Sequence, residues 1–233
     1  MKKNLFIILF FISVTGVFAG IILHLKWLDY LCKPLIMISL GGYFLLNSKN
    51  TDKNIVRFAM CAFLFSLLGD TFLMFTDKQM NFFMLGLSSF LVAQIAYIVL
   101  LLRSIKISGK QSFLGKNPTW LIGFLVYGGF VYFLLFNQLD NVLKIAVFVY
   151  MTALLGMSAM ALNRFKAVNS VSFFLVFTGS VLFVISDSLI AIDKFLNSIP
   201  HDRFWVMSTY ISAQLLIMMG ILKQFEKHSL RFL

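Results

Sequence analysis

The sequence carries little charge: only 12% of its 233 residues are Asp, Glu, Lys or Arg. A soluble domain has about a quarter of such residues, because its surface faces water. Here 60% of the residues are hydrophobic, phenylalanine occurs 28 times and the mean hydropathy is +0.91. This composition excludes a soluble all-α protein and predicts an all-α, polytopic integral membrane protein.

Cysteine is also rare. Cys32 and Cys61 form no CxxC pair, so each is interpreted as a small apolar residue rather than a disulfide partner or metal ligand. The three histidines fall in loops or the C-terminal tail without ligand spacing, and GxSxG, Walker and GxGxxG patterns are missing. We therefore expect no metal and no organic cofactor.

The net charge of +11 does not indicate a nucleic-acid partner, because the basic residues stand singly between apolar runs. Segments long enough to cross a bilayer predict eight helices. They fall at about 4–23, 30–46, 54–75, 80–102, 118–137, 141–163, 170–192 and 204–222. The second is short, and Pro34 is expected in its first turn, where a missing N–H is tolerated.

The distribution of Lys and Arg predicts the orientation. With the N-terminus on one side, that side has 14 basic residues against six on the other, which places both termini in the cytoplasm. We expect a bacterial inner-membrane protein. The first segment also resembles a secretory signal, but its apolar run is longer than usual, so a retained first helix is favoured.

Two similar blocks indicate an internal repeat. LFSLLGDTFLMFTDK (64–78) aligns with LFVISDSLIAIDKF (182–195), and Ala-Gln follows each, at 93–94 and 213–214. A lysine also opens the preceding outward end in both halves, Lys33 and Lys144. We expect a single transmembrane domain, 1–233, built from parallel halves at about 1–110 and 111–233.

Asp70 and Asp187 are the ionisable residues that the repeat aligns, each about five residues before the outer end of its span. An ionised Asp facing lipid costs on the order of 3 kcal/mol, so both should face the bundle interior or a wet cavity. Two nearby carboxyls oppose each other's ionisation, which leaves one acid and one carboxylate for acid–base catalysis. The alternative is structural: pairing with Lys33 or Lys144, or hydrogen bonds from Ser66 or Ser188.

Other polar residues could line the same cavity or serve as interhelical hydrogen bonds. Gln214 follows Tyr210 at i+4, and Tyr97 follows Gln94 at i+3, so each pair shares one helix face. Lys33 and Lys144 could hold a phosphate or could anchor their helices at the membrane surface. The candidate substrate-binding residues are Lys33, Lys144, Ser66, Gln94, Tyr97, Tyr210 and Gln214.

Five blocks carry a family resemblance over nearly the whole chain: SLLGDTFLM, GLSSFLVAQIAY, VYMTALLGMSAMA, FTGSVLFVISDSLIA and TYISAQLLI. They resemble the signature blocks of the YhhN-like membrane proteins, whose characterised members are lysoplasmalogenases. The resemblance implies hydrolysis of the vinyl ether bond of lysoplasmalogens, with Asp70 and Asp187 as catalytic groups. Where many relatives carry histidine, this sequence has Gln94, which cannot transfer a proton as imidazole can.

The expected partners are a lysophospholipid substrate within the bilayer and the surrounding lipids, with no protein partner indicated. A proton-coupled transporter or lipid carrier remains an alternative, because parallel repeats and buried acids also suit transport. A non-catalytic lipid-binding protein is a third possibility. Aldehyde release from lysoplasmalogen discriminates among the three.

Overall fold

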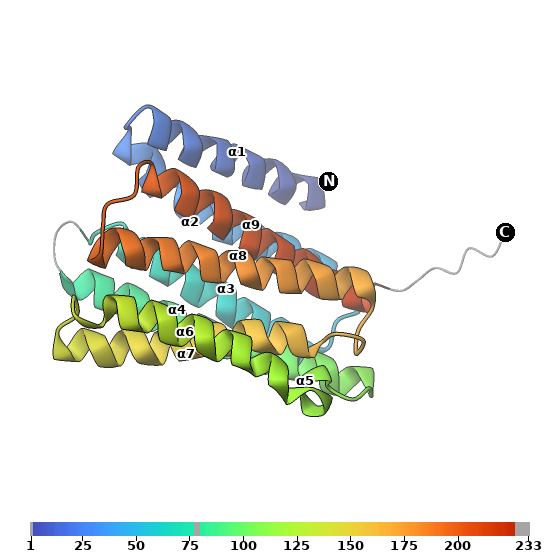
Figure 1. Ribbon diagram of the computed structural model, residues 1–233. Helices are drawn as coiled ribbons and strands as arrows, with labels where there is room; N and C mark the ends of the chain where they lie inside the picture. The colour runs from blue at the N-terminus through green and yellow to red at the C-terminus, as the bar shows by residue number, and fades with distance from the viewer. Residues whose placement is uncertain (1, 77–79, 227–233) are drawn as a thin grey trace.

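The computed structural model describes residues 2–76 and 80–226, and these residues form a bundle of long helices (Figure 1). Eight of the described helical segments are long and apolar enough to span a membrane, which confirms the predicted fold class. The elements are α1 (Lys2–Ile22), α2 (Lys26–Asn47), α3 (Lys53–Leu73), α4 (Met80–Ser108), α5 (Phe113–Lys116), η1 (Pro118–Trp120), α6 (Leu121–Phe136), α7 (Asn141–Asn163), α8 (Ser170–Phe195) and α9 (Asp202–Phe225).

Short polar segments set several helix starts. The Asp52 carboxylate accepts hydrogen bonds from two backbone N–H groups at the start of α3, and Asp140 does the same for α7. Asn169 caps α8 through the backbone N–H of Ser172. A side-chain oxygen at this position satisfies N–H groups that have no partner within the helix. The breaks between apolar runs therefore work as helix caps.

At the end of the bundle that holds the candidate site, the predicted limits were too narrow for α2, α8 and α9, whereas α3 ends at Leu73, two residues earlier than predicted. Here α2 begins at Lys26, so Pro34 lies inside the helix. The prediction that Pro34 lies in the first turn was therefore wrong. Charged residues extend α8 to Phe195 and start α9 at Asp202. Lys194 in a last turn and Asp202 in a first turn complement the helix dipole, which explains why helix continues through these polar positions.

Neighbouring helices pack closely where small residues meet. A Cβ atom added to Gly179 of α8 would lie only 2.9 Å from the carbonyl oxygen of Ala213 in α9. Gly69 of α3 likewise leaves room for the Phe90 ring of α4. Such small residues let membrane helices approach where apolar burial alone gives little driving force. These contacts fix α3 against α4 and α8 against α9 around the candidate site.

The two edge helices are the most lipid-exposed. Only 22% of the apolar window in α1 and 11% of that in α6 is buried in the protein. The first residues of α1 and the last residues of α9 lie at the same end of the bundle, as an even number of spans requires (Figure 1). Asp77 and Lys78, at the end of the first block of the proposed repeat, lie outside the described residues, as do Lys227, His228 and Arg231.

Candidate active site

Asp70 lies three residues before the end of α3 and is only 2% exposed. The Tyr210 hydroxyl donates a hydrogen bond of 2.7 Å to its Oδ2 atom. Lys33 Nζ lies 3.4 Å from Oδ1, so the buried carboxylate forms an ion pair with α2. This contact corresponds to the structural alternative considered for Asp70, although Ser66 is not the hydrogen-bond partner.

A chain of hydrogen bonds extends from Asp70 across the bundle core. Gln214 Nε2 lies 3.4 Å from the Tyr210 hydroxyl and donates to Ser66 Oγ at 3.1 Å. Gln214 Oε1 accepts from the Tyr97 hydroxyl at 2.6 Å. The structure thus brings Ser66, Tyr97, Tyr210 and Gln214 together with Asp70 in one buried network that joins α3, α4 and α9.

Asp187 has a different environment. The Tyr150 hydroxyl of α7 donates to its Oδ2 atom, and no ion pair to Asp187 occurs in the part of the chain that the structure describes. Asp187 lines an apolar cavity of about 60 Å³ between α3, α4, α7 and α8, and Tyr150 is the other polar residue in that lining. It lies eight residues before the end of α8, one turn deeper in its helix than expected.

The two acids lie in adjoining parts of the bundle core, since Leu73, one turn after Asp70 in α3, lines the cavity of Asp187. Aromatic rings fill the space beside them. Phe90 packs edge-on against Tyr210, with ring centroids 6.0 Å apart, and also lines the Asp187 cavity. One carboxyl in an ion pair and one against apolar side chains can take different protonation states, because the surroundings of a carboxyl decide whether its charge is tolerated.

Gln94 and Lys144 do not join the Asp70 network. Gln94 is fully buried, and neither amide atom has a hydrogen-bond partner within the described residues. Lys144 Nζ lies 4.3 Å from the centroid of the Phe136 ring. Lys144 does not line the apolar cavity of Asp187.

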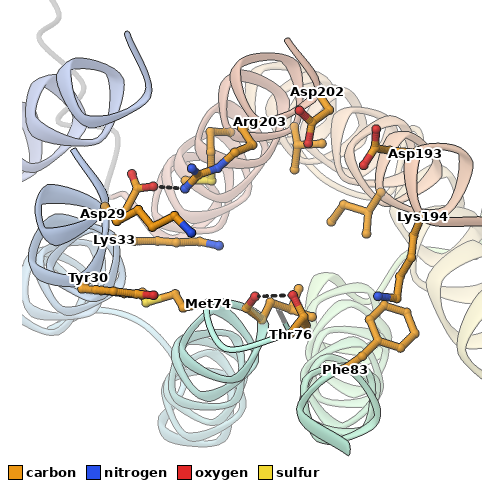
Figure 2. A pocket seen from close by; sticks show the side chains of 15 residues that line it. Asp29, Tyr30, Lys33, Met74, Thr76, Phe83, Asp193, Lys194, Asp202 and Arg203 are labelled. Carbon is orange, nitrogen blue, oxygen red and sulfur yellow. Dashed lines mark hydrogen bonds and ion pairs between the residues drawn. The ribbon is translucent and has the colours of Figure 1, made fainter. Parts of the chain in front are cut away.

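A larger cavity of about 360 Å³, here called the outer cavity, lies where α2, α3, α4, α8 and α9 end or begin (Figure 2). It shares Leu73, Phe83 and Ile190 with the apolar cavity, so the two cavities are adjacent. Lys33 reaches from its wall to Asp70. The outer cavity therefore lies beside the cavity of Asp187, and Lys33 connects its lining to Asp70.

The outer cavity carries charges of both signs. Its cationic residues are Lys26, Lys33, Lys194 and Arg203, and its acidic residues are Asp29, Asp193 and Asp202. Arg203 forms an ion pair with Asp29, which joins α9 to α2 (Figure 2). Such a lining suits a small polar group with both charges at the mouth of an apolar bundle.

Sequence reasoning did not single out Tyr150 or the charged residues around the outer cavity other than Lys33. Asp29 and Arg203 stood in segments interpreted as surface loops, so their pairing across 174 residues had no local signal. Tyr150 had one detectable signal: it precedes Asp187 by the same 37 residues that separate Lys33 from Asp70. Aligning the two halves on Asp70 and Asp187 places Tyr150 at the position of Lys33, which would have identified Tyr150 as a candidate partner of Asp187.

Comparison with protein families gives a match to the YhhN family over residues 28–221, which includes all the residues of the Asp70 network and Asp187. The lysoplasmalogenase TMEM86A of Bos taurus is 29% identical over 208 residues, covering 87% of this chain and 78% of the bovine protein. The Homo sapiens protein of the same name is 28% identical over the same extent. The lysoplasmalogenase TMEM86B of Mus musculus is 47% identical, but only over 45 residues. No solved structure matches this chain.

Proposed function

Because this chain belongs to the YhhN family, we propose that it is a membrane-embedded lysoplasmalogenase that hydrolyses the vinyl ether bond of lysoplasmalogens. The products are a fatty aldehyde and a glycerophospho-headgroup. The similarity to two mammalian lysoplasmalogenases over 87% of the chain supports the substrate class. The observation that carries the proposal is the pair of carboxyls in adjoining surroundings, the buried Asp70 in an ion pair with Lys33 and the half-buried Asp187 in an apolar cavity.

Vinyl ether hydrolysis begins with transfer of a proton to the β-carbon, which leaves an oxocarbenium ion that water captures. Asp187 is the proton donor, because its described partner is a neutral phenol and its cavity is otherwise apolar. Asp70 is the base, because Lys33 stabilises it as a carboxylate. Asp70 also stabilises the developing cation and takes a proton from the attacking water.

The second half of the reaction restores both acids. The hemiacetal hydroxyl returns its proton to Asp187 while Asp70 gives its proton to the departing glycerol oxygen, and the carbon–oxygen bond breaks. One water molecule is consumed, and the lipid becomes an aldehyde and an alcohol. The proposed reaction thus uses two carboxyl groups and one water molecule, in a site sheltered from bulk solvent.

The two cavities suit the two ends of the substrate. The charged outer cavity would hold the phosphate and its headgroup, with Lys33 and Arg203 as cations, and the apolar cavity would receive the start of the alkenyl chain. The rest of the chain would extend among the Phe-rich helices, reached laterally from the bilayer. In a bacterial inner membrane with both termini in the cytoplasm, the outer cavity would open toward the periplasmic side.

Aldehyde release by the purified full-length protein tests this function. Wild type is given lysoplasmenylethanolamine in detergent, and free aldehyde is followed by coupled reduction. We expect Asp70→Asn and Asp187→Asn each to lower turnover by about 10²–10⁴-fold, the usual contribution of a general acid or base. Asp140→Asn is the matched control, because asparagine caps a helix about as well as aspartate.

Loss of folding is checked separately by size-exclusion profile and melting temperature. If wild type releases no aldehyde while proteoliposomes take up lysolipid in response to a pH gradient, the carrier function replaces the hydrolase. If both Asn variants keep full turnover, the assigned roles are wrong even though the activity stands.

A further inference from the structure

The outer cavity holds two carboxylates that no described cation neutralises. Asp193 and Asp202 both line it, and neither forms an ion pair with any residue in 2–76 or 80–226. Asp193 Oδ1 accepts a hydrogen bond of 2.9 Å from the backbone N–H of Ile199, which ties the side chain to the loop between α8 and α9. Asp202 stands in the first turn of α9.

Figure 2 shows how these charges divide the cavity. Lys33 and the Arg203–Asp29 pair lie on one side, and Asp202, Asp193 and Lys194 lie at the α8–α9 side. The Lys194 ammonium lies over the Phe83 ring and forms no ion pair with any described residue. A phosphate beside Lys33 and Arg203 would leave a short cationic tail within reach of the two carboxylates. The volume of about 360 Å³ lies in the range of small-ligand sites, so such a headgroup fits.

The aromatic rings in the lining do not suit a quaternary ammonium group. Proteins hold choline-like groups against the open faces of several aromatic rings. Here Lys194 Nζ already lies 4.5 Å from the centroid of Phe83, and Tyr30 stacks on Phe75 with ring centroids 5.6 Å apart. Tyr30 and Phe83 also lie on opposite sides of the cavity, so they cannot form one cage (Figure 2).

We propose that the outer cavity selects lysolipids whose headgroup ends in a primary ammonium over those that end in a quaternary ammonium, with Asp193 and Asp202 accepting the ammonium hydrogen bonds. This inference rests on the proposed function, since it assigns part of the same substrate. A primary ammonium has three N–H donors for the carboxylates, whereas a trimethylammonium has none. A site that binds N–H groups disfavours an analogue without them, because its own acceptors then stay unpaired.

The kinetic test compares lysoplasmenylethanolamine with lysoplasmenylcholine of the same chain length in the same micelles. We expect wild-type kcat/KM to favour the ethanolamine lipid by at least about tenfold. In the Asp193→Asn, Asp202→Asn double variant the preference should fall to within about twofold, mainly through a higher KM for the ethanolamine lipid. The Asp193→Asn change retains a side-chain oxygen for the Ile199 N–H, so the loop keeps its contact. Asp140→Asn again serves as the control.

A binding measurement separates failure of this inference from failure of the proposed function. Lysophosphatidylethanolamine and lysophosphatidylcholine have no vinyl ether bond, and each is titrated against the melting temperature of the wild-type protein. Stronger stabilisation by the ethanolamine lipid, lost in the double variant, supports the inference even if no aldehyde is ever released. Equal stabilisation by both lipids, or none by either, overturns it. So does an equal loss of both activities in the double variant.

Discussion

Tyr150 stands in the same relation to Asp187 as Lys33 does to Asp70: each contacts its acid from a position 37 residues earlier in the chain. One half of the protein thus supplies a cation and the other half a neutral phenol. The two carboxyls are similar in sequence setting but differ in chemical partner. In the proposed reaction, this difference would allow the two carboxyls to perform different steps.

The Lys33–Asp70 ion pair predicts a large effect of Lys33→Met. Without the ammonium group, Asp70 loses its buried counter-ion and no longer persists as the carboxylate that the hydrolysis needs. We expect aldehyde release to fall by about 10²-fold or more, with part of it restored in Lys33→Arg. Lys106→Met is the control and should keep wild-type turnover, because Lys106 lies in the last turn of α4 and the outer cavity lies near the start of that helix. Full activity in Lys33→Met would refute the role given to this pair.

Tyr150→Phe tests the partner of the second acid. The variant removes the hydroxyl that donates to Asp187 but keeps the ring in the apolar cavity. We expect kcat to fall by about 10-fold with little change in KM, and the pH optimum of kcat to move. Tyr210→Phe is the comparison, because Asp70 would still be held by Lys33. An unchanged pH profile in Tyr150→Phe would mean that this hydroxyl is only structural.

Gln94→Leu is expected to raise the melting temperature. Both amide atoms of Gln94 are buried without a hydrogen-bond partner in the described structure, and an unsatisfied buried polar group costs about 1–3 kcal/mol. Leucine has a similar size and no such cost. The measurement is thermal unfolding in detergent, with the exposed Gln138→Leu as control. A lower melting temperature would show that Gln94 contributes a stabilising interaction and would contradict the prediction.

Arg164 predicts a stability effect far from the catalytic residues. Its buried guanidinium follows α7 and donates to Ser104 Oγ at 3.0 Å, Ser172 Oγ at 2.7 Å and Gln224 Oε1 at 2.8 Å. Arg164→Met leaves these acceptors buried without their donor, so we expect a loss of about 2–3 kcal/mol and a lower melting temperature. The exposed Arg57→Met should change little. Equal melting temperatures for the two variants would contradict the prediction.

Asp52 predicts how stability changes in acid. The Arg103 guanidinium, together with two backbone N–H groups of α3, lowers the pKa of the Asp52 carboxyl from 3.8 to about 2. Because the folded pKa is depressed, the stabilisation is present above about pH 4 and is lost as the pH falls toward 2. The melting-temperature difference between wild type and Asp52→Asn should therefore shrink over that range. A difference independent of pH would show that the charge contributes nothing.

The positions of the eight spans could be predicted because hydropathy is a property of consecutive residues. Their ends could not, since the helices continue through charged residues such as Lys26, Lys194 and Asp202, where hydropathy alone predicts a break. The sequence predicted shared helix faces for Tyr210 with Gln214 and for Gln94 with Tyr97, and, as one alternative, a hydrogen bond from Ser66 to Asp70. The structure joins Tyr97, Tyr210 and Gln214, and Ser66 contacts Gln214 instead of Asp70.

The sequence alone determined that this chain spans a membrane and that Asp70 and Asp187 are costly exceptions within it, because a polar residue among apolar neighbours needs no knowledge of contacts to be recognised. Only the tertiary structure decided that Lys33 neutralises one acid, that Tyr150 holds the other, and that Lys144 lies elsewhere. Those partners come from helices packed side by side but far apart in the chain, and their distances depend on how the whole bundle packs.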